Sequence, residues 1–205
     1  DRAKTEFVSV ASHQLRTPLT AIKWFLELIM TGDTGPINES QKDFLTQISD
    51  STERMIDLVN SLLNVSRIET GRITIEPEPT DLVIMAEKAT KELIPIFQKR
   101  KQVFKFNKPS KEIPKINIDP KLISEVIINL LSNASKYTPE DGSITISIDQ
   151  VDGNILFRVA DTGYGIPAHQ QHRLFDKFFR GENIVKYSTE GTGLGLYIVK
   201  AIVES

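Results

Sequence analysis

The hydrophobic periodicity of this 205-residue chain changes once, near Gly71, and the change separates a purely helical part from a mixed part. Before it, apolar residues recur every three or four positions along two long segments, as on one face of an α-helix. The first segment runs to about Thr31, and the second runs from Asn38 or Glu39 to Gly71. The glycines and the proline within residues 32–36 break the helix between them. The sequence therefore predicts an antiparallel pair of long helices.

Residues 1–70 contain nothing that would cover the apolar stripes of these two helices. An exposed apolar stripe is unfavourable in water, and two such hairpins can bury their stripes by pairing as a dimeric four-helix bundle. We therefore expect residues 1–70 to be a dimerisation domain through which the chain forms a homodimer.

Residues 71–205 are expected to form a second domain. Short stretches in which apolar and polar residues alternate predict strands, and longer stretches with helical periodicity predict helices. The predicted strands are Arg72–Glu76, Val103–Phe106, Lys115–Ile118, Ser143–Asp149 and Ile155–Ala160, and the predicted helices are Asp81–Lys99, Pro120–Lys136 and one that ends the chain. Pro77 and Pro79 are expected to end the first strand, and residues 151–154 predict a hairpin turn. The whole chain is predicted to be α+β, with a two-layer α/β sandwich and a mainly antiparallel sheet after the helical hairpin.

The composition excludes several classes of protein. A formal net charge of −2 gives no concentrated basic surface, so nucleic acid is not an expected partner. The chain has no cysteine, which excludes disulfides and fits a reducing, cytoplasmic location. No apolar run is long enough to cross a bilayer, so only flanking segments would attach a parent protein to a membrane. Both ends interrupt helices, and we expect a longer protein in which closing strands follow Ser205.

A lone histidine in the first helix is the first candidate for chemistry. His13 falls outside the apolar stripe, and Pro18 removes the amide that would bond the carbonyl of Gln14. The loosened turn beside the imidazole provides the access that a nucleophile needs. Most exposed histidines are ordinary surface residues, so His13 alone does not define a site.

A pair of asparagines marks a predicted helix of the second domain. Asn129 and Asn133 lie one turn apart, and Lys136 and Tyr137 follow. Amide oxygens suit a hard cation such as Mg²⁺, which keeps waters and phosphates among its ligands. The alternative is that both asparagines bond to neighbouring backbone groups.

Two glycine-rich segments complete the set of motifs. In the first, Asp161 ends a strand and precedes Gly163 and Gly165, so a buried carboxylate could accept a hydrogen bond from the exocyclic amine of adenine. An ordinary turn is the alternative there. In the second, residues 191–195 open the last helix, where free amides and the helix dipole favour a phosphate group. Neither a P-loop nor a Rossmann fingerprint fits this second segment.

In this order, the motifs resemble those of the catalytic core of sensor histidine kinases from two-component systems. A phenylalanine-rich box at residues 174–180 is the fifth motif, and the resemblance covers nearly the whole chain. It implies a dimerisation and phosphoacceptor domain followed by an ATP-binding domain of the kind shared with gyrase and Hsp90-type ATPases. It also implies ATP and Mg²⁺ as ligands and the receiver domain of a response regulator as the partner.

The resemblance implies a role for each candidate residue. His13 would take the γ-phosphoryl group on Nε2, Gln14 would hold the other ring nitrogen, and Thr17 would orient water for dephosphorylation of the regulator. Asn133 would be the Mg²⁺ ligand, and Asp161 would recognise adenine. The other implied positions are Asn129, Lys136 and Tyr137 near the phosphates, Gly163 and Gly165 in the pocket wall, Gly191, Thr192, Gly193, Leu194 and Gly195 around the phosphates, and Arg180 beside the transferred group.

Two residues depart from related patterns and keep alternatives open. The family usually carries Glu or Asp where this chain has Gln14, and an amide brings no negative charge to the imidazolium. The alternative function is therefore a dimeric nucleotide-binding scaffold with weak or lost kinase activity. Related ATPases carry a glutamate where this chain has Asn129. An amide cannot take a proton from water, so ATP hydrolysis is expected to be slow. The polar segment 181–190 is expected to be a mobile lid over ATP.

Overall fold

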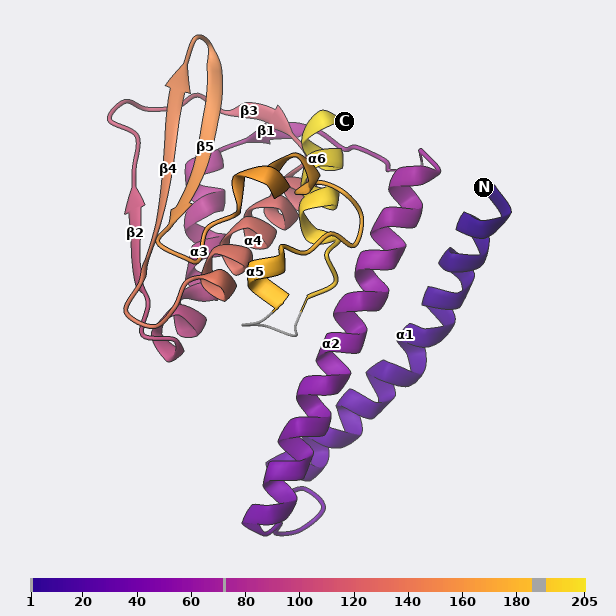
Figure 1. Cartoon of the computed structure of the whole chain (residues 1–205). Coiled ribbons are helices and arrows are strands. Elements are labelled where there is room, and N and C mark those ends of the chain that lie inside the picture. Colours follow the sequence, from indigo (N-terminus) through magenta and orange to yellow (C-terminus); the bar gives the residue numbers. More distant parts are fainter. Residues whose placement is uncertain (1, 72, 186–190) are drawn as a thin grey trace. The chain divides into compact units, whose positions relative to one another are not determined.

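The computed structural model describes residues 2–71, 73–185 and 191–205, and it describes the side chains of these residues except 2–9, 13, 184 and 185 (Figure 1). The chain forms two compact units, residues 1–73 and 74–205. Within the described part of the chain, no helix is both long and apolar enough to span a membrane. The predicted α+β class is confirmed.

The first unit is a helical hairpin. α1 (Arg2–Thr31) and α2 (Glu39–Glu69) pack along one another, as the sequence predicts (Figure 1). Pro18 lies inside α1 and does not end it. α2 begins at a capping box, in which Asn38 Oδ1 accepts from the Gln41 amide (2.8 Å) and Gln41 Oε1 accepts from the Asn38 amide (2.9 Å).

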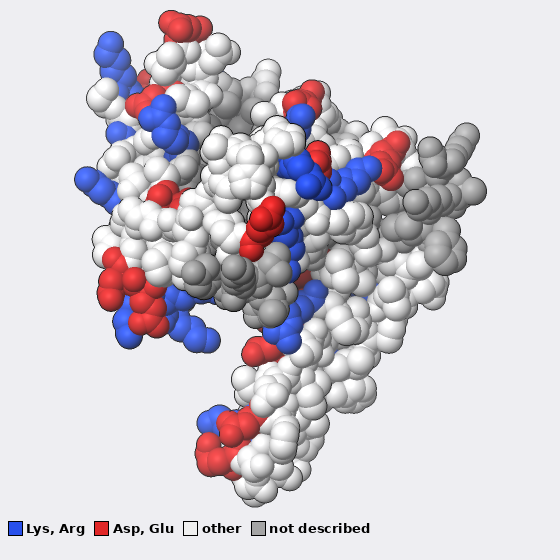
Figure 2. All heavy atoms as spheres, in the orientation of Figure 1, with Lys and Arg blue, Asp and Glu red and all other residues white. Residues whose placement is uncertain are grey.

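The hairpin buries one apolar face and leaves other apolar side chains exposed. Leu19 and Leu26 of α1 are buried, as are Val59 and Leu63 of α2. Among the described side chains of this unit, the large apolar ones that are exposed are Val10, Leu15, Ile22, Trp24, Phe25, Met30, Phe44, Ile48, Met55 and Leu58. On the face shown in Figure 2, much of the hairpin surface is uncharged. The uncovered apolar surface that the sequence predicts is therefore present.

The second unit has two layers, one of strands and one of helices (Figure 1). The strands are β1 (Glu78–Thr80), β2 (Val103–Asn107), β3 (Ile116–Ile118), β4 (Ser143–Val151) and β5 (Asn154–Asp161), and the helices are α3 (Leu82–Lys99), α4 (Pro120–Tyr137), the 3₁₀ helix η1 (Ala168–Arg173), α5 (Glu182–Val185) and α6 (Gly195–Glu204). Ile144, Ile146 and Ile148 alternate along β4 and are fully buried. They share one apolar core with Phe97 of α3 and Leu131 of α4, so this core joins the two layers.

The main sheet is mixed, whereas the sequence predicted a mainly antiparallel one. Its strand order is β2–β4–β5, with β2 parallel to β4 and β4 antiparallel to β5. A parallel pair needs a long crossover, and the connection from β2 to β4 contains α4. The predicted hairpin at residues 151–154 is confirmed, because Asp152 (φ 50°) and Gly153 (φ 81°) both adopt the left-handed backbone of a type I′ turn.

The predicted strand Arg72–Glu76 is wrong. Arg72 lies outside the described residues, and the rest of this segment forms no strand. The chain instead becomes extended in β1, which contains Pro79 and pairs with β3 in a separate two-stranded sheet. A proline is tolerated there because a two-stranded sheet has free edges. The Glu76 amide donates to Asp119 Oδ2 (2.9 Å), so a helix cap rather than a strand ladder holds this segment.

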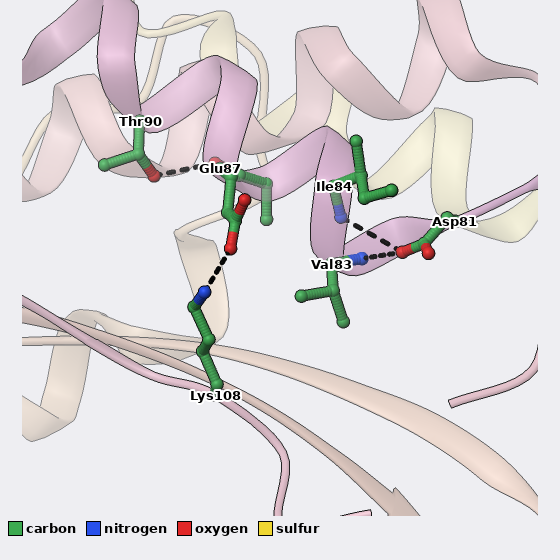
Figure 3. Close-up of polar contacts among 7 residues, drawn as sticks. Asp81, Val83, Ile84, Glu87, Thr90 and Lys108 are labelled. Carbon is green, nitrogen blue, oxygen red and sulfur yellow. Dashed lines mark hydrogen bonds and ion pairs between the residues drawn. The ribbon is translucent and has the colours of Figure 1, made fainter. Parts of the chain in front are cut away.

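An aspartate cap also starts α3. Asp81 Oδ1 accepts from the amides of Val83 (2.9 Å) and Ile84 (3.0 Å), as Figure 3 shows. Further along α3, Glu87 forms an ion pair with Lys108 (2.5 Å), which directly follows β2. These contacts fix the start of α3 and tie the helix to the sheet layer.

Asp119 is the N-cap of α4 and provides a test of this part of the fold. Backbone hydrogen bonds from Glu76, Leu122 (3.1 Å) and Lys121 (2.9 Å) lower the pKa of its carboxyl group. Because the folded pKa lies below the unfolded value of about 3.9, the resulting stability is present above about pH 4 and is lost as pH falls through the folded pKa.

We expect Asp119→Ala to lower the free energy of unfolding by about 1–2 kcal/mol at neutral pH, because the variant leaves the capped amides without their acceptor. Denaturant titrations at neutral pH and between about pH 4 and pH 2 measure this effect. The difference between variant and wild type should shrink in acid. A difference that is unchanged in acid would contradict the assigned role of the carboxylate.

Candidate active site

A cavity of about 440 Å³ lies in the second unit and is lined by residues of α4, the loop after β5, and α6. Five of the residues predicted from the sequence line it, namely Asn133, Tyr137, Asp161, Gly165 and Arg180. The other lining residues are Leu130, Ala134, Val159, Ile166, Gln171, Leu174, Phe179, Gly181, Asn183 and Leu196. A largely apolar wall with a few polar groups is typical of a small-molecule site.

The two asparagines of α4 have different surroundings. Asn129 Nδ2 donates to Glu125 O (3.1 Å), so this amide bonds to its own helix, as the alternative interpretation had it. A Cβ atom at residue 195 would lie 3.0 Å from Asn129 Oδ1, which places this oxygen at the start of α6. Asn133 lies one turn later and lines the cavity. Of the two, Asn133 is therefore the one placed to contact a ligand.

The predicted burial of Asp161 is wrong, because its side chain is exposed at the cavity. β5 is the edge strand of the main sheet, and the chain leaves that sheet at Asp161. Asp161 Oδ1 accepts from the Gly163 amide (2.9 Å), which turns the loop back on itself. The carboxylate is therefore accessible to a ligand.

No side chain fits at Gly163. A Cβ atom there would overlap the carbonyl oxygen of Tyr137 and would lie 2.6 Å from Asp161 Oδ1. The amide of Tyr164 donates to the same Tyr137 oxygen (3.1 Å). The loop after β5 and the end of α4 are thus in direct backbone contact, and this contact forms one wall of the cavity.

Lys136 lies beside the second glycine segment. A Cβ atom at Gly191 would lie 2.6 Å from Lys136 Nζ and 3.8 Å from Tyr137 Oη. Burial raises the pKa of the Tyr137 phenol, and the positive charge of Arg180 acts in the opposite direction. Tyr137 is therefore neutral at physiological pH, and the positive charges come from Lys136 and Arg180. Two cations and the carboxylate of Asp161 suit a ligand that carries both an anion and a hydrogen-bond donor.

The second glycine segment leads into α6 and contacts the phenylalanine box. Thr192 Oγ1 accepts from the Leu194 amide (3.2 Å), and Leu194 is fully buried. Gly193 has φ +68°, and a Cβ atom there would lie 2.7–2.9 Å from backbone atoms of Phe178. Phe178 also has a positive φ (61°), which is rare for a bulky residue. The two segments are therefore packed backbone against backbone.

His13, Gln14 and Thr17 belong to the first unit, on α1. The side chains of Gln14 and Thr17 are exposed. The side chain of His13 lies outside the described residues, so its predicted solvent-facing position stays a prediction. Residues 186–190 of the predicted lid also lie outside the described part of the chain.

Asn183 lines the cavity although no sequence motif marks it. Its Nδ2 donates to Gly165 O (2.9 Å) and to Tyr164 O (3.4 Å). The preceding residue, Glu182, exchanges hydrogen bonds with Gln170, since its carboxylate accepts from the Gln170 amide group and its backbone amide donates to Gln170 Oε1 (3.1 Å). The start of the predicted lid is thus attached to the region after β5. Polar composition was the only signal in the sequence, and it does not identify partners.

Comparison with protein families gives one match in each unit. Residues 3–71 match the His Kinase A (phospho-acceptor) domain, and residues 118–205 match the histidine kinase-, DNA gyrase B- and HSP90-like ATPase domain. The circadian input-output histidine kinase CikA of Synechococcus elongatus is 34% identical over 206 residues, which are 98% of this chain and 27% of that protein. The chain thus spans about a quarter of the length of this curated relative.

Solved structures of similar fold include full-length ShkA and the histidine kinase AdeS. Full-length ShkA in complex with AMPPNP aligns with a TM-score of 0.77 and 26% identity, over 97% of this chain and 40% of that one. The histidine kinase AdeS of Acinetobacter baumannii aligns with a TM-score of 0.62 and 26% identity, over 94% of this chain and 86% of that one.

Proposed function

Because this chain belongs to the sensor histidine kinase family, we propose that it is an ATP-dependent kinase that phosphorylates its own His13. The phosphoryl group then passes to an aspartate in the receiver domain of a response regulator. The observation that carries the proposal is the cavity of the ATPase domain, where Asn133, Tyr137 and Asp161 meet near the second glycine segment. A phosphoacceptor helix precedes this domain in the same chain.

The residues around the cavity fit adenosine triphosphate. The carboxylate of Asp161 is an acceptor for the adenine amine, and the apolar lining suits the purine ring. Gly163 and Gly165 keep side chains out of the wall. Lys136, whose Nζ lies beside Gly191, and the amides of residues 191–195 would hold phosphates near the start of α6.

Mg²⁺ is the cation that we propose to accompany the nucleotide. Among the residues that the structure describes, no group of three or more His, Cys, Asp or Glu side chains could hold a metal ion. The amide oxygen of Asn133 is a hard ligand, and Mg²⁺ commonly completes its octahedral shell with phosphate oxygens and water. When bound, the ion would offset the negative charge of the phosphates.

His13 is the proposed nucleophile on α1. The neutral imidazole is the nucleophilic form, because its unprotonated nitrogen carries a free lone pair. Nε2 attacks the γ-phosphorus, the bond to the bridging oxygen breaks, and ADP leaves with the electron pair. The side-chain oxygen of Gln14 accepts a hydrogen bond from Nδ1–H and so selects the reactive tautomer. Arg180 offsets charge on the transferred group.

Incubation of the chain with γ-labelled ATP and Mg²⁺ tests this proposal. We expect an acid-labile, base-stable label that is absent from His13→Ala. Tight nucleotide binding without label would support the alternative, a nucleotide-binding scaffold. Since Asn129 cannot activate water, His13→Ala should also hydrolyse ATP slowly, and rapid turnover would instead support an ATPase function.

The hairpin is the proposed site of both protein partners. Trp24 and Phe25 are each more than half exposed in one copy of the chain, and pairing of two hairpins would bury such side chains. On the face shown in Figure 2, much of the hairpin surface is uncharged, which suits a protein partner better than a nucleic acid. Thr17 is exposed on α1, where it would orient water during dephosphorylation of the regulator. Sedimentation analysis would test the homodimer.

Gln14→Glu is expected to raise the initial rate of His13 phosphorylation by up to about tenfold, because a carboxylate adjacent to the imidazole stabilises the developing positive charge. The rate of label incorporation at saturating ATP measures the effect. Gln47→Glu makes the same change at an exposed position of α2 and should leave the rate unaltered. A loss of about tenfold or more in Gln14→Glu would count against the role assigned to Gln14.

A further inference from the structure

A buried glutamine lies behind the end of α4 and is not among the cavity-lining residues. Gln102 lies between α3 and β2, and its surface is only 8% exposed. Its Nε2 donates to Ser135 O (2.7 Å) and to Thr138 O (2.6 Å), and its Oε1 accepts from Ser135 Oγ (2.7 Å). Both side-chain N–H groups and the side-chain carbonyl oxygen are therefore used.

The end of α3 directs Gln102 toward α4. Lys101 adopts the left-handed conformation (φ 53°), and its amide donates to Gln98 O (3.0 Å). The Gln102 amide donates to Phe97 O (2.8 Å), which completes the hydrogen-bond pattern of a Schellman motif. Phe97 is fully buried and stacks on Phe104 of β2. The backbone of Gln102 is thus anchored in the core of the domain.

The end of α4 needs donors that its own backbone does not supply. The last backbone hydrogen bond of the helix is made by the Thr138 amide (3.1 Å). The next one would join Ser135 O to residue 139, which is a proline and has no amide hydrogen. Gln102 supplies the donor, together with Nη1 of Arg100 (3.1 Å). Side chains from the turn after α3 therefore complete this helix end.

The two carbonyls held by Gln102 flank a functional segment. Ser135 and Thr138 stand on either side of Lys136 and Tyr137 in the sequence. Tyr137 lines the cavity, and Lys136 Nζ lies at the second glycine segment. Gln102 therefore holds the backbone from which these two side chains project.

We infer that Gln102 is a positioning residue for the nucleotide phosphates and acts through Lys136 and Tyr137. The inference rests on the proposed function, in which these two residues contact phosphates and Asp161 binds adenine. The place of Asp161 is set by the pairing of β5 with β4, where it lies opposite Ile144. Loss of the Gln102 hydrogen bonds should therefore disturb phosphate binding and spare adenine binding.

Gln102→Leu in the full chain tests this inference, because leucine has a similar volume and makes no hydrogen bonds. We expect the affinity for Mg·ATP, measured by calorimetry, to fall about tenfold, since the buried carbonyls of Ser135 and Thr138 lose the Gln102 donor and the segment shifts. The affinity for adenosine, measured by NMR titration, should change by less than about twofold. Equal losses for the two ligands, or no loss for Mg·ATP, would overturn the inference.

Gln98→Ala is the matched control, because Gln98 is an exposed glutamine of the same helix end, and both affinities should stay unchanged. If Gln102→Leu does not fold, Gln102→Asn is the second variant, because it keeps the amide on a shorter side chain. It should show a smaller loss of affinity for Mg·ATP and again spare the affinity for adenosine. Equal losses for the two ligands, or no loss for Mg·ATP, would overturn the inference. A wild-type chain that binds no Mg·ATP would contradict the proposed function instead.

Discussion

Gly163→Ala is expected to weaken Mg·ATP binding and to slow His13 phosphorylation on the order of 100-fold. The added methyl group would overlap the carbonyl oxygen of Tyr137 and crowd Asp161 Oδ1. A backbone atom cannot rotate away, so relief requires movement of about 1 Å between the loop after β5 and the end of α4. That movement displaces groups proposed for both ends of the nucleotide.

Calorimetry with Mg·ATP and NMR titration with adenosine measure this effect. Both affinities should fall, because the added methyl group crowds Asp161 Oδ1 as well as the end of α4. This outcome differs from the one expected for Gln102→Leu, where adenosine binding is spared. Affinities in Gly163→Ala within about threefold of wild type would show that the backbone contact is not needed for binding.

Gly193→Ala is expected to reduce phosphorylation of His13 by at least about 50-fold, for two separable reasons. The left-handed backbone at this position (φ +68°) disfavours alanine by about 1–2 kcal/mol. In addition, the methyl group would lie 2.7–2.9 Å from backbone atoms of Phe178 and 2.9 Å from Phe179 O. The second glycine segment and the phenylalanine box would then have to separate, which removes the proposed phosphate site.

Gly153→Ala separates the two reasons. Gly153 also has a left-handed backbone (φ +81°), but a Cβ atom there would meet no atom within 4 Å. This control should lose about 1–2 kcal/mol of stability and keep its rate of phosphorylation. Equal losses of activity in Gly153→Ala and Gly193→Ala would mean that backbone strain, and not the contact with Phe178, accounts for the effect.

Much of the fold could be predicted because its signals are local. The end of α1 at Thr31 follows from the adjacent glycines, and the starts of α3 and α4 follow from caps at Asp81 and Asp119 that bond to amides two and three residues later. The turn at Asp152 and Gly153 is equally local. Each of these features depends on residues within a few positions of one another.

The predictions that were wrong concern partners distant in the sequence. The alternation after Arg72 resembles a strand, but the strand that pairs with β3 is β1, which contains Pro79. Likewise, the period of β2 does not reveal that it pairs parallel to β4. The exposure of Asp161 follows from the place of β5 at the edge of the sheet.

In the candidate site, too, local signals could be predicted from the sequence and contacts between distant residues could not. Periodicity, caps and motif order specified most of the elements, their order and five of the residues that line the cavity, because such signals act over one or two helical turns. Three-dimensional packing set how those residues meet: Gln102 bonds to residues 33 and 36 positions away, and Asn183 bonds to a loop 18 positions earlier. No local pattern encodes these contacts, since each depends on where a packed domain brings two distant pieces of backbone together.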